Sequence, residues 1–501
     1  MVKRNLIANY LSAAWSGLMG LVFLPVYIDF LGVEAFGLIG AFAVLQGWFA
    51  LLDMGLSPTL NREMARFSAG AHTPQGIRNL LHTMEVIYLG IALVLAGLVM
   101  GYSDWIAVHW LKAGQLPVAT IAQALAISGV IVACRWMTTL YRSTLLGLQR
   151  QVWLSVSTAG FATLRGAGVI VVLALVSPTI QAFFLFQGLV ALLEMLVLGM
   201  QARRSLPVPP QRPVFSLAAL KGVWEFAAGM TLITILATLL MQVDKLLLST
   251  LLPLAQFGYF TLATMMAGTL SLFIGPIANV AYPRFTELVE QRRQGVLVEQ
   301  YHKLSQLLSC IVLPVALVLC FFAHEVVWVW TGNSSTADAV APVLSVWVVG
   351  SALNGLMHTP YLAQLAHGWS RLTVIVNAVA VAIIVPALLV LVPRYGVMVA
   401  AWIWVAINAT YILVSITVMH RRILRGEKWR WYWNDVLQPL LAGALVAALL
   451  VLAKSWLPQG GRVAGFLFLA MAGLAVLAAT ALATPLGRGV LRQGISSVVR
   501  A

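Results

Sequence analysis

Charged residues are few in this sequence: Asp, Glu, Lys and Arg make up 9% of its 501 residues, whereas hydrophobic residues make up 61%. Soluble domains carry about 25% charged residues. The mean hydropathy is correspondingly high, at +0.92. Most of the chain therefore lacks the polar surface that a water-soluble fold requires, and the composition indicates a helical bundle immersed in lipid.

Cysteine is also rare, because the chain has only 3 cysteines and none of them forms a CxxC pair. This spacing argues against a disulfide framework and against a thiolate metal site. The sequence contains no Walker loop, no HExxH and no GxSxG motif. The longest loop expected on the outer face runs only from about Tyr102 to Pro117, which is too short for the external carboxylate constellation of a membrane glycosyltransferase or ligase. We therefore expect a non-enzymatic protein with no catalytic residues, no metal site and no cofactor.

Apolar stretches recur along nearly the whole chain, and each is long enough to cross a hydrocarbon core of about 30 Å as a helix of about 20 residues. We predict an all-α integral membrane protein with about fourteen transmembrane helices. The predicted ranges are 6–28, 36–57, 80–101, 118–141, 152–176, 181–200, 223–243, 256–280, 304–330, 342–366, 373–392, 397–419, 437–456 and 463–483.

Acidic residues are half as numerous as basic ones, 16 against 31, so the net charge is +15. If the N-terminus is cytoplasmic, the predicted topology places 24 basic residues in cytoplasmic segments and 5 on the outer side, and leaves Arg135 and Arg165 within helices. Such an asymmetry is typical of the positive-inside rule. The excess of Lys and Arg is therefore explained by topology, with both termini cytoplasmic, and we expect no nucleic-acid partner.

The two halves of the chain show a weak internal repeat. Leu31, Phe36 and Gly37 recur as Leu252, Phe257 and Gly258, and internal repeats are how many transporters build a central site. We predict two six-helix lobes at 1–210 and 211–430, related by a pseudo-two-fold axis along the membrane normal. Residues 431–501 would add two transmembrane helices and a cytoplasmic tail, and the proline-rich stretch 203–213 would link the lobes.

Several short motifs resemble those of the Wzx-type flippases, the polysaccharide-exporter branch of the multidrug/oligosaccharidyl-lipid/polysaccharide superfamily. They are Asn5-x3-Asn9; Pro25-Val-Tyr27-Ile-Asp29-Phe-Leu31-Gly32-Val-Glu34-Ala-Phe36-Gly37; Leu52-Asp53-Met-Gly55-Leu56 with Asn61-Arg62; Gly147-Leu-Gln149-Arg150; and Gln242-Val-Asp244-Lys245 with Phe257-Gly258-Tyr259. The resemblance implies translocation of a polyprenyl-pyrophosphate-linked oligosaccharide to the periplasmic leaflet of a bacterial inner membrane by alternating access. It also implies a role in O-antigen, capsule or exopolysaccharide assembly, beside a polysaccharide polymerase and a chain-length regulator.

In that architecture the first and seventh helices line the cleft, and both carry polar stripes in this sequence. The spacing within each stripe places its members along one helix face. We predict that they bind the substrate: Asn5, Asn9, Ser12 and Ser16 on the first helix, and Thr231, Thr234, Thr238, Gln242 and Lys245 on the seventh. The alternative is that these groups bond to their own helix or join neighbouring helices.

Arg165 lies near the middle of the predicted helix 152–176, where a charge costs at least about 2.5–3.5 kcal/mol. Its planar guanidinium matches a phosphate, so we predict that it anchors the pyrophosphate. The alternative is a structural pair with Glu194 of the next helix. Arg135 is a second candidate ligand, although its position near the end of its helix would also allow it to snorkel to the surface.

Repeated transport in one direction needs a driving ion or voltage, and we expect coupling to Na⁺ or H⁺. The candidate groups are Glu225, Asn377, Asn408 and Glu194. The alternative is that Glu225 is an ordinary acidic residue at the membrane interface. The body of the first helix carries no acidic residue, unlike that of many multidrug exporters, and this difference argues against drug export. A lipid II flippase and a multidrug exporter of the same fold remain the alternative functions.

Overall fold

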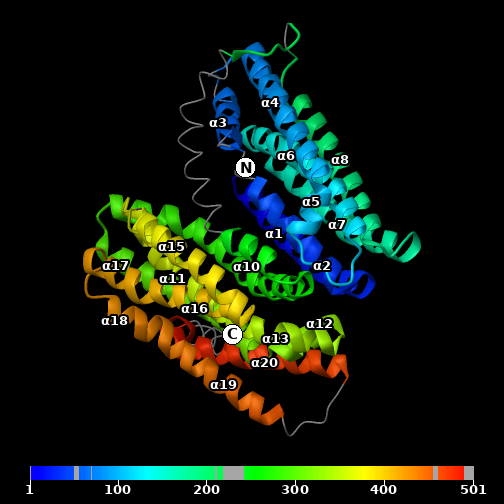
Figure 1. Ribbon diagram of the computed structural model, residues 1–501. Helices are drawn as coiled ribbons and strands as arrows, with labels where there is room; N and C mark the ends of the chain where they lie inside the picture. Colours follow the sequence, from blue (N-terminus) through cyan, green and yellow to red (C-terminus); the bar gives the residue numbers. More distant parts are fainter. Residues whose placement is uncertain are drawn as a thin grey trace, which may run out of the picture. The chain divides into compact units, whose positions relative to one another are not determined.

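The computed structural model describes residues 2–49, 53, 56–68, 70, 72–208, 211–217, 242–369, 371–454 and 461–489. Almost all of these residues are helical, and the only β-pairing among them is an isolated bridge between Lys112 and Pro253. The protein is thus an all-α, multi-pass membrane protein, as predicted. The helices group into two compact units, residues 1–258 and 259–501 (Figure 1).

The first unit contains eight helices whose bounds the structure gives. They are α1 (Val2–Val22), α2 (Leu24–Phe49), α3 (Leu56–Ser68), α4 (Pro74–Gly101), α5 (Ser103–His109), α6 (Val118–Gly147), α7 (Gln151–Leu175) and α8 (Ile180–Arg204). Local signals set the ends, since the side chains of Thr73 and Thr179 accept hydrogen bonds from the first turns of α4 and α8. Helix α6 runs beside α4 and α8, and α1 packs against α7 (Figure 1).

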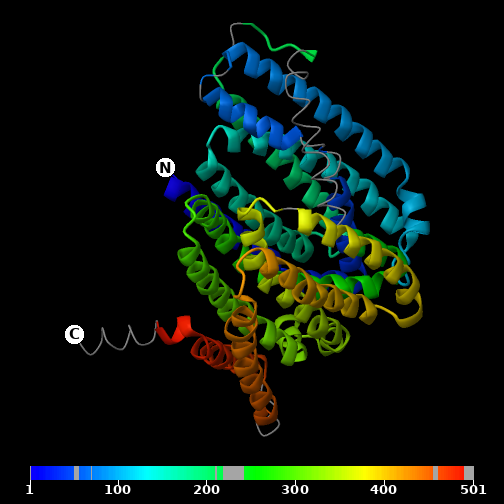
Figure 2. The same cartoon turned by 90° about the vertical axis from the view of Figure 1, so that its left-hand side faces the viewer.

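The second unit holds most of α10 (Leu254–Glu290), which begins in the first unit, and then the remaining helices. These are α11 (Gln294–Phe321), α12 (Ala323–Thr331), α13 (Ser334–Leu356), α14 (His358–Ala366), α15 (Arg371–Tyr395), α16 (Met398–Thr410), η2 (Tyr411–Ser415), α17 (Ile416–Arg422), α18 (Lys428–Arg430), η3 (Trp431–Leu437), α19 (Gln438–Lys454) and α20 (Arg462–Ala483). The C-terminal pair α19 and α20 packs on α11 (Figure 2).

Twelve helices in the described part of the chain are long and apolar enough to cross a membrane. They coincide with twelve of the fourteen ranges predicted from the sequence. The predicted range 6–28 corresponds largely to α1, and the range 223–243 lies almost wholly outside the described residues. The predicted boundaries were wrong in places: α6 continues to Gly147, beyond the predicted end at 141, because its last turns remain buried against α3 although they include polar residues.

The two copies of the internal repeat meet within the first unit. A Cβ atom at Gly258 would lie 2.6 Å from the carbonyl oxygen of Val33, and one at Gly37 would overlap the carbonyl oxygen of Leu254. Both positions therefore require glycine, because no side chain fits between the two backbones. The division of the chain into lobes at 1–210 and 211–430, with an extension from 431, stays a prediction.

The predicted linker is bound along α4 as an extended strap. Gln75, Asn79 and Thr83 lie one turn apart and accept hydrogen bonds from the backbone N–H groups of Gln211, Val214 and Ser216, at 3.1, 3.1 and 2.9 Å. The guanidinium of Arg78 donates to the carbonyl oxygens of Arg203, Leu206 and Pro207 at 2.7, 2.8 and 3.0 Å. Side chains of α4 thus bind the backbone N–H and C=O groups of a loop that has no helix or sheet partner for them.

We expect Arg78→Ala to release this strap while leaving the bundle folded, because three carbonyl groups lose their donor but the helix core is unchanged. Limited trypsin digestion of the purified protein should then cleave after Arg204, where the strap begins, faster by about tenfold. His82→Ala is the matched control, since His82 lies one turn away on α4 and approaches Glu85 only at 3.9 Å. Equal cleavage rates in the wild type and Arg78→Ala would show that the strap does not depend on this arginine.

Candidate functional site

Three helices of the first unit bring their charged side chains to one place. Arg165 of α7 donates from Nη1 to Glu194 Oε2 at 2.9 Å, and Arg142 of α6 donates from Nη2 to Glu194 Oε1 at 3.3 Å. Glu194 of α8 is buried, whereas the two guanidinium groups remain partly exposed. The structure therefore shows the pair between Arg165 and Glu194 that was the alternative to a free anchor, and it adds a second arginine to that pair.

Arg135 lies two turns before Arg142 on α6, close enough to Arg165 and Glu194 to interact with both electrostatically. It does not snorkel to the surface. Its Nη1 donates to Gln46 Oε1 of α2 at 2.7 Å, and its carbon Cζ lies 5.8 Å from the centre of the Phe42 ring. A guanidinium that is held this way in the bundle is expensive to bury, and that cost points to a functional role.

The region around Arg135 contains buried donors that the described residues do not satisfy. Arg135 Nε and Gln46 Nε2 are both buried, and neither has a hydrogen-bond partner in the described structure. Unsatisfied buried donors cost about 1–3 kcal/mol each, so native proteins rarely keep them without a reason. Because both atoms are donors beside a cationic group, the chemistry of this place suits an acceptor-rich anion.

We define the arginine centre as Arg135, Arg142, Arg165 and Glu194. Sequence reasoning missed Arg142, because the predicted end of its helix at 141 assigned this arginine to a cytoplasmic loop. The spacing of Arg135 and Arg142, seven residues apart, was the signal that would have found it, since such residues share one face of a helix. The centre carries three positive charges and one negative charge.

The predicted stripe on α1 faces α7 in part. Asn9 Oδ1 accepts a hydrogen bond from Ser155 Oγ of α7 at 2.9 Å, Ser12 is buried, and Ser16 Oγ is a buried atom without a partner in the described structure. The hydrogen bond between Asn9 and Ser155 joins α1 to α7, as expected if the polar groups of this stripe hold neighbouring helices together. Asn5 belongs to α1 by its backbone. A substrate-binding role for these residues stays a prediction.

The stripe predicted on the seventh helix falls mostly outside the described residues, which exclude Thr231, Thr234 and Thr238. Gln242 is described and packs so closely on α2 that a Cβ atom at Gly47 would lie 2.7 Å from its Cδ. Lys245 is half-buried. The substrate-binding role of this stripe is likewise untested.

The predicted ion-coupling residues do not form one described cluster. Asn377 accepts a hydrogen bond from the Tyr411 hydroxyl at 3.3 Å, whereas Asn408 accepts one from Asn354 Nδ2 at 2.9 Å. Glu194 belongs to the arginine centre, and Glu225 lies outside the described residues. The coupling role of these four residues stays a prediction.

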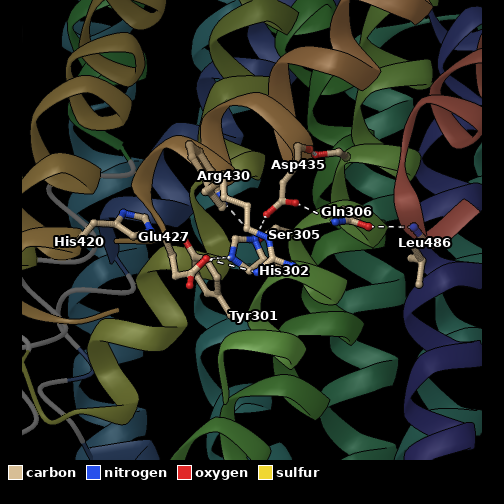
Figure 3. A network of polar contacts seen from close by, with 11 residues as sticks. Tyr301, His302, Ser305, Gln306, His420, Glu427, Arg430, Asp435 and Leu486 are labelled. Carbon is tan, nitrogen blue, oxygen red and sulfur yellow. Dashed lines mark hydrogen bonds and ion pairs between the residues drawn. The ribbon is translucent and has the colours of Figure 1, made fainter. Parts of the chain in front are cut away.

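A second polar network, which sequence reasoning missed, lies in the second unit (Figure 3). The imidazole of His302 on α11 contacts Asp435 Oδ2 through Nδ1 at 2.5 Å and Glu427 Oε2 through Nε2 at 2.9 Å. Gln306 donates to Asp435 Oδ1 at 2.9 Å and accepts from the backbone N–H of Leu486 at 2.9 Å. The network thereby joins α11 to the segments on both sides of the C-terminal helix pair.

The π-helical turn η3 explains how Asp435 reaches α11. Its wider winding re-aims side chains relative to a regular α-helix, and Asp435 and Trp431 are both fully buried there. Trp431 Nε1 donates to Ser305 Oγ at 3.1 Å. The aromatic and basic run 428–433 therefore contributes one tryptophan to the core of the unit, while Trp429 and Trp433 remain exposed.

Comparison with known proteins identifies the family of this chain. A family model described as "Polysaccharide biosynthesis protein" matches residues 2–289. The chain belongs to that family. A curated relative from Shigella flexneri, named "Putative O-antigen transporter", is 20% identical over 407 residues, which cover 80% of this chain and 94% of the relative.

Solved structures share the fold of this family member. The lipid II flippase MurJ in an inward closed conformation aligns with a TM-score of 0.69 at 11% identity, covering 94% of this chain and 97% of MurJ. An inward-facing MATE-family multidrug resistance transporter of the MOP superfamily aligns with a TM-score of 0.65 at 15% identity, covering 83% and 94%. Family and fold are those of membrane transporters and flippases, not of enzymes.

Proposed function

We propose that this protein moves polyprenyl-pyrophosphate-linked oligosaccharide repeat units from the cytoplasmic to the periplasmic leaflet of a bacterial inner membrane, by alternating access. The observation that carries the proposal is the arginine centre, in which Arg142 and Arg165 both pair with the one carboxylate of Glu194 and Arg135 lies within its electrostatic influence. Guanidinium groups bind phosphate oxygens bidentately, and a pyrophosphate would supply the acceptors that Arg135 and Gln46 lack.

The composition of the arginine centre favours an anionic cargo over a cationic drug. A site for amphipathic cations would need unpaired carboxylates, whereas Glu194 is already engaged by two arginines. A lipid II flippase would need the same cationic chemistry, so it remains the second candidate. The family and the Shigella relative support the polysaccharide role in O-antigen, capsule or exopolysaccharide assembly.

The protein would also need a defined orientation in the membrane, a source of energy and partners that use its product. Both termini would face the cytoplasm, because this orientation places most of the 31 basic residues on that side. Coupling to Na⁺ or H⁺ through Glu225, Asn377, Asn408 or Glu194 would bias the cycle. A polysaccharide polymerase and a chain-length regulator would receive the product on the outer side.

Deletion of the gene tests this function. We expect lipid-linked oligosaccharide to accumulate in the inner leaflet and surface polysaccharide to disappear, because an amphiphile with a charged headgroup does not cross the bilayer unaided at a useful rate. The measurement is the leaflet distribution of the radiolabelled lipid-linked sugar, with plasmid-borne wild-type protein as the control. Normal surface polysaccharide with new sensitivity to cationic drugs would contradict the proposal, and arrested peptidoglycan synthesis with accumulated lipid II would assign the second candidate function.

A further inference from the structure

Glu194 lies behind the two arginines that it contacts. Its side chain is 3% exposed, whereas the side chains of Arg165 and Arg142 are 23% and 38% exposed. A carboxylate in this position is less accessible to an incoming ligand than the two guanidinium groups that it contacts. Glu194 is therefore placed to organise a binding site and not to contact the ligand itself.

The carboxylate holds the two arginines through different oxygens. Arg165 uses Oε2 and Arg142 uses Oε1, so one planar group fixes side chains from α7 and α6 at the same time. Each contact uses one guanidinium nitrogen, and a guanidinium carries five N–H donors. Donors on both arginines thus remain available in a fixed relative position. Without the carboxylate, the guanidinium groups of Arg142 and Arg165 would repel each other, because like charges interact strongly in a medium of low dielectric constant.

The charge of the arginine centre matches a particular headgroup. Arg135, Arg142 and Arg165 contribute three positive charges and Glu194 one negative charge, so the centre carries two net positive charges. A phosphate esterified on two sides carries one negative charge, and a pyrophosphate esterified at both ends therefore carries two. A monophosphate diester would leave one positive charge of the centre uncompensated.

We propose that Glu194 is a positioning residue that holds Arg142 and Arg165 as a two-armed phosphate clamp, and that the fixed spacing of the two arms makes the site prefer a pyrophosphate diester to a monophosphate diester. This inference rests on the proposed function and specifies the substrate class of the same site. It assigns Glu194 a role that requires no direct contact with the substrate.

Binding to the purified full-length protein in lipid nanodiscs tests this role. The probes are farnesyl glucosyl diphosphate, farnesyl glucosyl monophosphate and the neutral farnesyl glucoside, each titrated by calorimetry. We expect the wild type to bind the diphosphate about tenfold or more tightly than the monophosphate, because only the diphosphate engages both arms of the clamp. Glu194→Gln should reduce this preference to about twofold, since the arms separate while each arginine still binds one phosphate. Glu194→Asp should retain an intermediate preference.

The preference ratio distinguishes positioning from a merely structural role. Loss of folded protein would lower the binding of both phosphate probes equally, and an unchanged ratio in Glu194→Gln would overturn the inference while leaving the proposed function intact. If the wild type bound neither phosphate probe better than the neutral glucoside, the proposed function and this inference would both fall. Glu299→Gln is the matched control, because Glu299 is 59% exposed and pairs only with Lys303 in the described contacts, and it should keep the wild-type ratio.

Discussion

Arg165→Ala is expected to abolish transport of the lipid-linked oligosaccharide, with a loss of about 100-fold or more in the flipping rate of reconstituted protein. The reason is that Arg165 supplies one arm of the proposed clamp at a depth where water cannot replace its donors. Expression should fall little, because Glu194 keeps its contact with Arg142. Arg165→Lys should recover part of the rate, since it retains the charge but loses the planar fork.

The double variant Arg165→Ala with Glu194→Ala separates substrate binding from helix pairing. If Arg165 served only to neutralise Glu194, removing both would restore folded yield and transport together. The clamp predicts that transport stays absent, because Arg142 alone cannot bind both phosphates. Full activity of this double variant would rule out Arg165 as the pyrophosphate anchor and leave it a residue that pairs α7 with α8.

Among the proposed variants of this protein, Asp435→Ala is expected to lose the most folding stability. The carboxylate of Asp435 is fully buried and contacts both His302 and Gln306, so its removal leaves His302 Nδ1 and Gln306 Nε2 without the acceptor that they contact. Breaking a buried pair in this way costs about 3–5 kcal/mol. The C-terminal pair α19 and α20 should detach first, because Asp435 lies in the π-helical turn that leads into α19.

Thermal unfolding in detergent, followed by the reactivity of Cys310 with a maleimide, measures this effect. The sulfur of Cys310 lies 3.5 Å from the Thr484 hydroxyl, just after α20, so undocking of that helix would uncover the thiol. Asp338→Asn is the control, since Asp338 also pairs with a histidine but is 72% exposed. An Asp435→Ala protein with the wild-type unfolding temperature and thiol reactivity would show that the network contributes nothing to docking.

The membrane fold could be predicted from the sequence because its cause is local. A stretch of apolar residues long enough to cross the bilayer must satisfy its own backbone groups, and a helix does this within one segment. The same local cause accounts for the twelve spans that the described residues confirm. Helix ends were less accurate, as α6 shows, because the last turns of a helix are held by neighbours that hydropathy does not reveal.

The candidate site depended on contacts that no single segment encodes. Sequence alone identified Arg165 as an expensive charge and Glu194 as an available partner, and the two are paired. It could not identify Arg142 as a third member, because the side chains of α6, α7 and α8 converge only when the helices pack. His302 and Asp435 are 133 residues apart, so their pairing was equally invisible in the sequence.

The sequence by itself therefore determined that this protein lies in a lipid bilayer, that it is helical and where its most costly charges are. Each of these properties follows from the transfer free energy of the residues in one segment at a time. Only the tertiary structure decided which charges neutralise one another. The energy of an ion pair depends on the distance between its groups and on their burial, and both are properties of packed helices. Glu194 shows the difference, because its sequence position marks it only as a buried acid, whereas its place behind two arginines gives it a chemical role.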